Sequence, residues 1–177
     1  MSEPSDAILA DVAALHQDVD ARFTRTTDGL PLHCTRGCAD CCDDDLTVWE
    51  VEAAHLQAYV QREGLRPVVH APGRCAWLTA EGACQVYPAR PYVCRSQGAV
   101  MRWVDVADGQ EQRATCQLHA SLIPVAQLSL HQTFELGPAE ERLLALATRW
   151  HARLGDKGLP LRVPLRGLAE SLSERPK

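Results

Sequence analysis

The stretch Cys34-Thr-Arg-Gly-Cys38-Ala-Asp-Cys41-Cys42 places four cysteines within nine residues. Four more, Cys75, Cys84, Cys94 and Cys116, follow in the central part of the chain. Thiolates are soft, strong ligands for zinc and iron, and a fold rarely gathers so many unless a metal or disulfides join them. The choice between these two cross-links determines what kind of protein the chain encodes.

The composition predicts a single domain that needs such a cross-link. The chain has 177 residues, of which 46% are hydrophobic and only 5% aromatic. We expect one domain over 1–177, with an N-terminal helix at 5–26, a cysteine-cluster metal-binding core at 30–120 and a helical C-terminal extension at 121–177. Because residues 29–109 lack long apolar runs, we expect a metal or covalent link to stabilise them.

The N-terminal sequence bears on the redox compartment. It begins with early acidic residues and has no basic segment followed by an apolar run, so it does not resemble a secretory signal. No stretch has the continuous apolar length of a membrane span. We therefore expect a cytoplasmic protein that does not enter a membrane, where thiols stay reduced and clustered cysteines indicate metal more often than disulfides.

The predicted fold is mostly α with a small irregular α+β cysteine-rich centre, and the N- and C-terminal helices pack around the metal-binding core. Apolar residues at helical spacing predict a helix from Ser5 to about Arg25. A capping box formed by Thr47 and Glu50 predicts a second helix that ends at Gly64. The remaining expected elements are a hairpin that joins 75–78 to 84–87, a strand at 100–106, a helix from Pro138 to Gly155 and an amphipathic tail at 159–177.

All eight cysteines are candidate metal ligands. The spacing of Cys34, Cys38 and Cys41 lets their sulfur atoms converge, as in ferredoxin-like runs and zinc knuckles. Cys41 and Cys42 are adjacent, so their side chains should diverge, one toward this group and the other toward a second site or the core. Eight thiols permit two four-ligand sites, or one site with spare ligands. Cys116 has the strongest alternative interpretation, as a small buried hydrophobe. The spacing slightly favours an iron–sulfur cluster over zinc.

Other residue types near the cysteines are secondary candidates. His33, next to Cys34, and His119, three residues after Cys116, are the histidines best placed to bind a metal. The acidic run forms a solvated turn or supplies one oxygen ligand. Nearby arginines are positioned to offset the negative charge of a thiolate centre. The acidic residues are Asp40, Asp43, Asp44 and Asp45, and the arginines are Arg36, Arg90 and Arg95.

Both cysteine groups together resemble a bacterial cysteine-cluster family of zinc- or iron-chelating domains (YkgJ-type). The resemblance rests on the Cys34–Cys42 spacing, on Cys75-Ala-Trp-Leu with Cys84, and on Tyr87-Pro-Ala-Arg-Pro-Tyr-Val-Cys-Arg95. Cys116 is similar to a later cysteine of that family. The resemblance implies that these cysteines bind metal. It also implies that Arg90 and Pro91 act structurally, Pro91 by fixing the turn into Cys94 and Arg90 by pairing with a carboxylate or a cluster sulfur.

Three functions follow from these observations. The favoured one is a metal-binding protein with one or two cysteine-ligated centres, iron–sulfur or zinc, and a redox or metal-handling role; whether it is an enzyme stays open. The alternatives are a structural-zinc interaction module without catalysis and a thiol oxidoreductase that uses Cys41 or Cys42. The net charge of -5 argues against a nucleic-acid partner and leaves a protein partner open.

Overall fold

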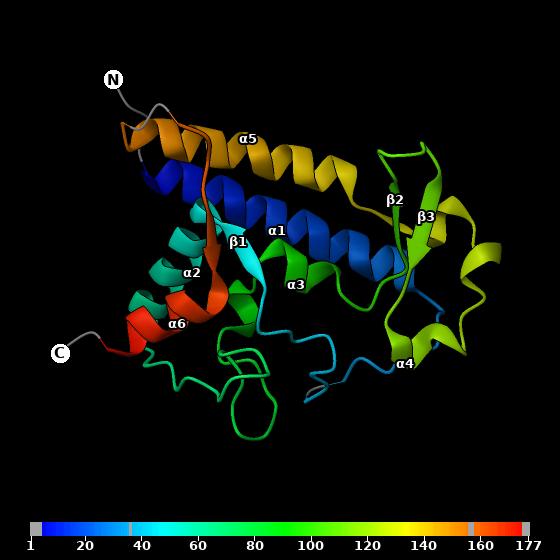
Figure 1. Ribbon diagram of the computed structural model, residues 1–177, viewed down its shortest axis with the longest axis horizontal. Helices are drawn as coiled ribbons and strands as arrows, with labels where there is room; N and C mark the ends of the chain where they lie inside the picture. The colour runs from blue at the N-terminus through cyan, green and yellow to red at the C-terminus, as the bar shows by residue number, and fades with distance from the viewer. Residues whose placement is uncertain (1–4, 36, 156–157, 175–177) are drawn as a thin grey trace.

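Two antiparallel helices, α1 (Ser5–Thr27) and α5 (Gly137–Arg153), form the upper layer of the molecule in Figure 1. The computed structural model describes residues 5–35, 37–155 and 158–174. The apolar stripe predicted for the N-terminal helix is buried against α5. The shared core comprises Ile8, Val12, Leu15 and Val19 of α1, Leu143, Leu146 and Ala147 of α5, and Val51, Tyr92, Ala99 and Phe134 from the layer below. The helices expected at 5–25 and 138–155 are thus confirmed.

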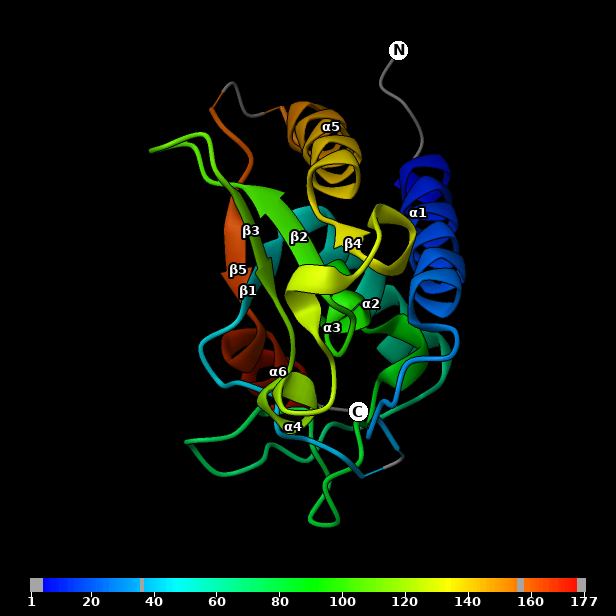
Figure 2. The same cartoon turned by 90° about the vertical axis from the view of Figure 1, so that its right-hand side faces the viewer.

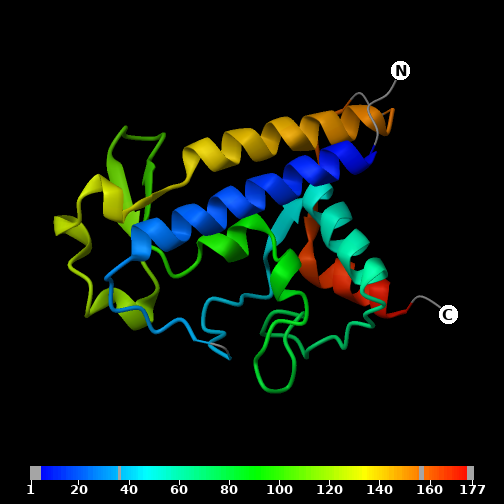
Figure 3. The ribbon, with the colours of Figure 1, turned by 180° about the vertical axis from the view of Figure 1, so that it is seen from behind.

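The lower layer consists of shorter elements that carry or support the cysteines. Its helices are α2 (Glu50–Arg62), α3 (Tyr92–Ser96) and α6 (Leu165–Ser173). In Figure 3 these elements lie below α1, and long loops close the bottom of the molecule. The fold is mostly helical, as expected. α1 and α5 pack on each other, and the cysteine-bearing loops lie at the opposite edge (Figure 1). The C-terminal helix α6 packs against the core that contains Cys75, and the packing of the terminal helices around a metal-binding core stays a prediction.

The predicted start of the second helix is also wrong. Thr47–Trp49 is a strand, β1, and α2 begins only at Glu50. β1 pairs antiparallel with β5 (Arg162–Pro164), with Val48 opposite Val163. The Thr47 hydroxyl accepts a hydrogen bond from Arg162 Nε at 3.1 Å instead of capping a helix. Pairing with a distant strand therefore overrides the local capping signal.

A small mixed sheet occupies the other end of the molecule. β2 (Met101–Val104) confirms the strand expected at 100–106 and pairs antiparallel with β3 (Glu111–Ala114) and parallel with β4 (Phe134–Glu135). The hairpin of β2 and β3 extends away from the helices in Figure 2. After β3 come α4 (Gln117–Ala120) and two 3₁₀ turns, Val125–Gln127 and Leu130–Gln132. A further 3₁₀ turn at Tyr87–Ala89 precedes α3.

The middle of the chain buries more apolar surface than its sequence suggests. Cys75-Ala-Trp-Leu78 and Val86 are buried in a second core together with Leu56 of α2 and Leu168 of α6. The Trp77 indole N–H donates to the Leu165 carbonyl at 3.1 Å. The hairpin expected around 79–83 is present as a closed loop with a single bridge between Leu78 and Cys84. The scattered apolar residues thus bury against distant helices rather than against each other.

Buried polar groups connect α1, α2 and α3. Glu52 Oε1 accepts the backbone N–H of Tyr92 at 2.7 Å and lies 3.1 Å from His16 Nε2, and the side chains of Glu52 and His16 are both 3% exposed. The rings of His16 and His55 meet edge to face with centroids 5.3 Å apart. Burial, and then the charges of His16 and Arg95, lower the pKa of His55 to about 4. Within the described ranges, no helix is both long and apolar enough to cross a bilayer.

His55 should make the free energy of unfolding depend on pH. The unfolded chain takes up a proton on this ring near pH 6.5, whereas the folded chain does so only near pH 4. The unfolded state therefore binds more protons between these values, and the free energy of unfolding falls as the pH decreases from 6.5 to 4. Urea unfolding across this range should show a weaker pH dependence for His55→Gln than for the wild type. His131→Gln, at an exposed position, is the control; an unchanged slope in His55→Gln would contradict the prediction.

Candidate metal centre

The cysteine-rich loop between α1 and β1, residues 28–46, lies between two other cysteine-bearing segments. In Figures 1 and 3 it runs along the bottom of the molecule, with α4 on one side and the loop of residues 70–86 on the other. Cys116 is the N-cap of α4, whereas Cys75 and Cys84 belong to the second loop. All eight cysteines are free thiols. The loop thus brings its four cysteines between the remaining four.

Four cysteines, which we call the inner group, gather against the second core. Cys75 is buried there and is only 8% exposed, and the other three pack against the same cluster of apolar side chains. The backbone N–H of Cys75 donates to the Cys42 carbonyl at 3.2 Å, which joins the two loops directly. The bridge between Leu78 and Cys84 holds the two sides of the hairpin loop together. The inner group comprises Cys42, Cys75, Cys84 and Cys94.

The remaining cysteines form the outer group, on the α4 side of the loop. The backbone N–H of His33 donates to His119 Nε2 at 2.8 Å, which holds the start of the loop against α4. Cys34 and Cys116 therefore lie on the two segments that this bond joins. A turn closed by the Cys38 N–H and the Thr35 carbonyl, at 3.0 Å, folds the loop back. The outer group comprises Cys34, Cys38, Cys41 and Cys116.

The pKa shifts of the thiols follow the same division except at Cys41. Partial burial raises the pKa of Cys34, and the charges of the other three outer thiols raise it further. Burial raises the pKa of Cys94, and the charges of Cys75, Cys84, Glu52 and Cys41 add to this. Thiols that raise each other's pKa lie within electrostatic reach of one another, and a bound cation would reverse this repulsion.

The two groups meet at Cys41 and Cys42. A hydrogen bond between their side chains lowers the pKa of Cys41 to about 7 and raises that of Cys42 strongly. Cys42 is also affected by the charges of Cys75 and Cys94, whereas Cys34 is affected by that of Cys41. The expectation that these adjacent side chains diverge is wrong, because they hydrogen-bond to each other; their service to two different centres stays a prediction.

The donor chemistry fits a soft metal ion or an iron–sulfur cluster. Two groups of four thiols each supply the ligand number that both require. Among the described residues, no three cysteine, histidine or acidic side chains already converge tightly enough to enclose one ion. A change of χ1 between staggered rotamers redirects a thiol without moving the backbone. The groups are thus sets of neighbouring donors whose side chains must turn to coordinate a metal.

His33 and His119 hold the cysteine-rich loop against α4 in this structure. His119 is fully buried, and its Nε2 accepts the His33 N–H, so the neutral ring carries its proton on Nδ1. Neither nitrogen of His119 in this arrangement offers a lone pair to a metal. The Nδ1 atom is buried and has no hydrogen-bond partner among the described residues. A buried donor three residues from Cys116 is compatible with a negatively charged sulfur centre nearby.

The charged residues singled out in the sequence mostly hold the scaffold. Arg90 and Arg95 both pair with Asp20 of α1, and Arg95 also donates to the carbonyls of Arg90 and Pro88. This confirms a carboxylate as the partner of Arg90. Burial raises the pKa of Cys84 and the charge of Arg90 acts against this rise, so Arg90 offsets thiolate charge as expected while it also pairs with Asp20. Arg36 lies outside the described residues.

One of the acidic residues also has a structural partner. Asp44 accepts Arg166 Nε of α6 at 2.7 Å and the Gly73 N–H at 3.1 Å. The hydrogen bond from Arg166 holds the pKa of Asp44 below its usual value. Arg166 also donates to the carbonyls of His70 and Arg74, so it fixes both loops that carry inner cysteines. Asp44 is therefore a support of the inner group and not a solvated residue or an oxygen ligand.

Sequence reasoning missed three residues that position the cysteines. Asp20 holds the Arg95 end of α3, and Glu52 accepts the Tyr92 N–H at its start; Cys94 lies between the two. Gly98 has a φ of +93°, and a Cβ there would lie 2.6 Å from Cys34 Sγ. The glycine could have been noticed because it closely follows the Cys94-Arg95 pair. Asp20 and Glu52 lie on helices where nothing in the sequence distinguishes them from exposed acids.

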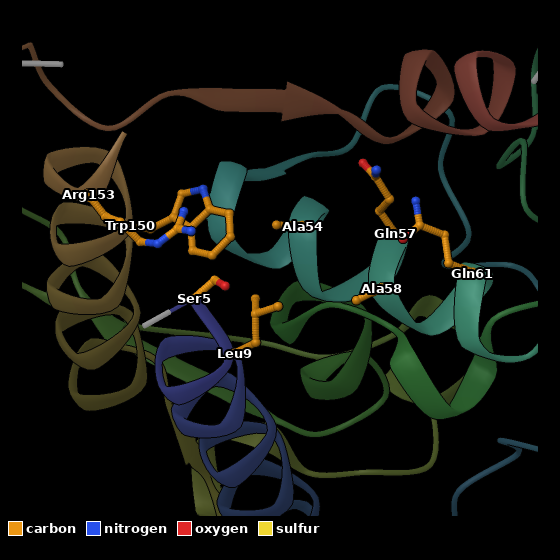
Figure 4. Close-up of a pocket in the computed structure, with 8 residues that line it drawn as sticks. All are labelled: Ser5, Leu9, Ala54, Gln57, Ala58, Gln61, Trp150 and Arg153. Atoms are coloured by element: carbon orange, nitrogen blue, oxygen red, sulfur yellow. The ribbon is translucent and has the colours of Figure 1, made fainter. Parts of the chain in front are cut away.

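A separate cavity of about 310 Å³ lies where α1 begins, between α2 and α5 (Figure 4). Apolar side chains and a few polar ones line it, and none of them is a cysteine, histidine or carboxylate. It therefore offers no metal ligand and no paired acid and base. The lining residues are Ser5, Leu9, Ala54, Gln57, Ala58, Gln61, Trp150 and Arg153.

Comparison with known proteins places all eight cysteines within the match to one family model. Residues 33–119 match the model of a family, CxxCxxCC, described as "Putative zinc- or iron-chelating domain". The match begins at His33 and ends at His119, the two residues whose hydrogen bond joins the cysteine-rich loop to α4. No curated protein and no solved structure matches the chain.

Gly98→Ala should disturb the outer group. The substitution adds a Cβ that overlaps Cys34 Sγ at a backbone conformation that already disfavours side chains. Gly109→Ala is the matched control, since Gly109 has a φ of +70° but no atom within 4 Å of the position that a Cβ would take. The control should lose about 1–2 kcal/mol of unfolding free energy from the backbone conformation alone. Gly98→Ala should lose more in urea unfolding, and equal losses would show that Cys34 is not held against Gly98.

Proposed function

Residues 33–119 belong to the zinc- or iron-chelating CxxCxxCC family, and from that premise we propose that the inner and outer groups each bind a metal centre through four cysteine thiolates. The centres are iron–sulfur clusters or zinc ions, with iron–sulfur favoured by the Cys34, Cys38 and Cys41 spacing. The protein handles metal or transfers electrons in the cytoplasm, where its thiols remain reduced.

The observation that supports this proposal is the neighbourhood of the thiols: Cys42, Cys84 and Cys94 pack against the core that contains Cys75, and Cys38, Cys41 and Cys116 lie within electrostatic reach of Cys34. Four thiolates complete the coordination of a zinc ion and also hold a [2Fe–2S] or [4Fe–4S] cluster. The repulsion that raises the pKa of Cys34 and Cys94 also favours a cation, because binding removes the protons and offsets the charge.

The partner and the reaction belong to the proposal as well. The net charge of -5 favours a protein or small-molecule partner over a nucleic acid. Electron transfer needs no ligand other than the cluster, whereas metal handling needs an acceptor for the ion. Both functions use the same thiols, so the identity of the bound metal distinguishes them.

A thiol oxidoreductase is the second candidate, and one observation favours it. The pKa of Cys41 is lowered to about 7 by the hydrogen bond with Cys42, which would give a reactive thiolate at neutral pH. The evenly divided thiol groups give no reason for such a role, since a single reactive pair would leave the other cysteines unexplained. We therefore place this function after metal binding.

Anaerobic purification followed by elemental analysis and a visible spectrum tests the proposal. Iron with sulfide and a brown colour would identify clusters, and a colourless protein with zinc would identify zinc centres. We expect Cys38→Ser and Cys75→Ser each to lose about half of the bound metal, because each removes one thiolate from one group of four.

Thr35→Ser, in the same loop as Cys38 and at an exposed position, is the control and should keep the full metal content. Both cysteine variants retaining wild-type metal content would overturn the assignment of ligands. A reduced, folded wild-type protein that binds neither zinc nor iron after reconstitution would overturn the proposed function itself.

A further inference from the structure

We propose that the two centres differ in kinetics: the outer group exchanges its metal with external acceptors, and the inner group keeps its metal as a structural cross-link. This inference rests on the proposed function and adds a division of labour within it. The acceptor is a thiol-bearing or chelating ligand that reaches the cysteine-rich loop from solvent. The difference follows from how each group is built into the fold.

One cysteine of the outer group lies on a thin, solvent-facing segment, whereas Cys38, Cys41 and Cys116 are half-buried. Cys34 is exposed, as are the adjacent His33, Thr35 and Gly37. The segment belongs to none of the described strands; a turn at Cys38 and the bond from His33 to His119 hold it. Such a segment opens at a lower free-energy cost than the packed core, so its ligands can leave a metal one at a time.

The inner group is built into packed structure. Its four cysteines lie in or against a core that also contains Trp77, Leu56 and Leu168. The Cys42 carbonyl accepts the Cys75 N–H. Arg166 donates to Asp44 and to the carbonyls of His70 and Arg74, so it holds the two loops together. Releasing an ion from this group requires separation of the hairpin loop, α3 and α6, which amounts to unfolding that half of the molecule.

The exchange step conserves charge and electrons. An incoming thiolate forms one bond to the outer metal as one cysteine thiolate of this chain leaves, and the released thiolate takes up the proton that the incoming thiol gave up. No redox step is needed. Cys34 is the most exposed of the outer cysteines and is the ligand that we expect to leave before the others.

His119 is the positioning residue that limits this opening. It accepts the His33 N–H at 2.8 Å from a fully buried position, so it connects the exposed loop to the segment that carries Cys116. His119→Phe keeps a buried ring but removes the acceptor. His33→Ala separates the hydrogen bond from the ring contact, because it keeps the backbone N–H that makes the bond and removes a ring that stacks on His119.

Zinc release from the fully reconstituted full-length chain tests the inference. The protein is mixed with an excess of the chromogenic chelator 4-(2-pyridylazo)resorcinol, and released zinc is followed by absorbance. We expect two phases of equal amplitude, one ion each, with the outer phase about tenfold faster or more because a local opening suffices. Native mass spectrometry after the fast phase should show the folded chain with one zinc ion.

The variants assign the phases. Cys34→Ser and Cys116→Ser should abolish the fast phase and leave the slow phase and the fold intact, as judged by circular dichroism. His119→Phe should speed the fast phase about tenfold, as loss of a supporting contact typically weakens a metal site, and leave the slow phase unchanged. His33→Ala should release zinc at the wild-type rates.

The outcomes separate the inference from the proposed function. A single phase that releases both ions, or a fast phase that persists in both Cys34→Ser and Cys116→Ser, would overturn the inference while metal binding stands. Absence of bound zinc before the chelator is added would overturn the proposed function. A slow phase that is lost together with the fast phase in Cys34→Ser would overturn the inference by showing that the two groups form one centre.

Discussion

The peptide bond between Cys41 and Cys42 is the constraint on which the site depends. The side chains of these two adjacent residues hydrogen-bond to each other, so one short loop holds a thiol of each group at the point where the groups meet. The loop must then lie between the partners of each group. On one side the bond from His33 to His119 provides this, and on the other the bond from Cys75 to Cys42 does. Both groups thus use the same loop, whereas a different hydrogen bond holds each group to its neighbouring segment.

The helices position α3, which carries Cys94, through a buried polar contact at its start and a half-buried one at its end. Glu52 accepts the N–H of Tyr92 at its start, and Asp20 pairs with Arg95 at its end. A five-residue helix has too few internal hydrogen bonds to be stable alone. Because buried polar groups are costly when unpaired, these contacts specify one position for α3 and therefore for Cys94.

Sequence reasoning predicts the features that depend on local pattern. The long helices α1 and α5 have regular apolar spacing, and the strand at Met101–Val104 alternates, so all three are confirmed. The strand at Thr47–Trp49 escapes such reasoning because its partner lies more than a hundred residues away at Arg162–Pro164. The partition of the cysteines stays open in the sequence for the same reason: it depends on which distant segments flank the loop.

The two cores explain why the metal matters to only part of the fold. The core between α1 and α5 contains no cysteine among its described members and is filled by aliphatic and aromatic side chains, most of them from helices. The second core contains Cys75 and is bordered by the other inner thiols, and its loops have a single bridge where a hairpin would have a ladder. Hydrophobic burial alone can therefore account for the upper layer. In the lower layer, sulfur–metal bonds would supply the cross-links that β-pairing supplies elsewhere, so the cysteines are part of the architecture as well as of the site.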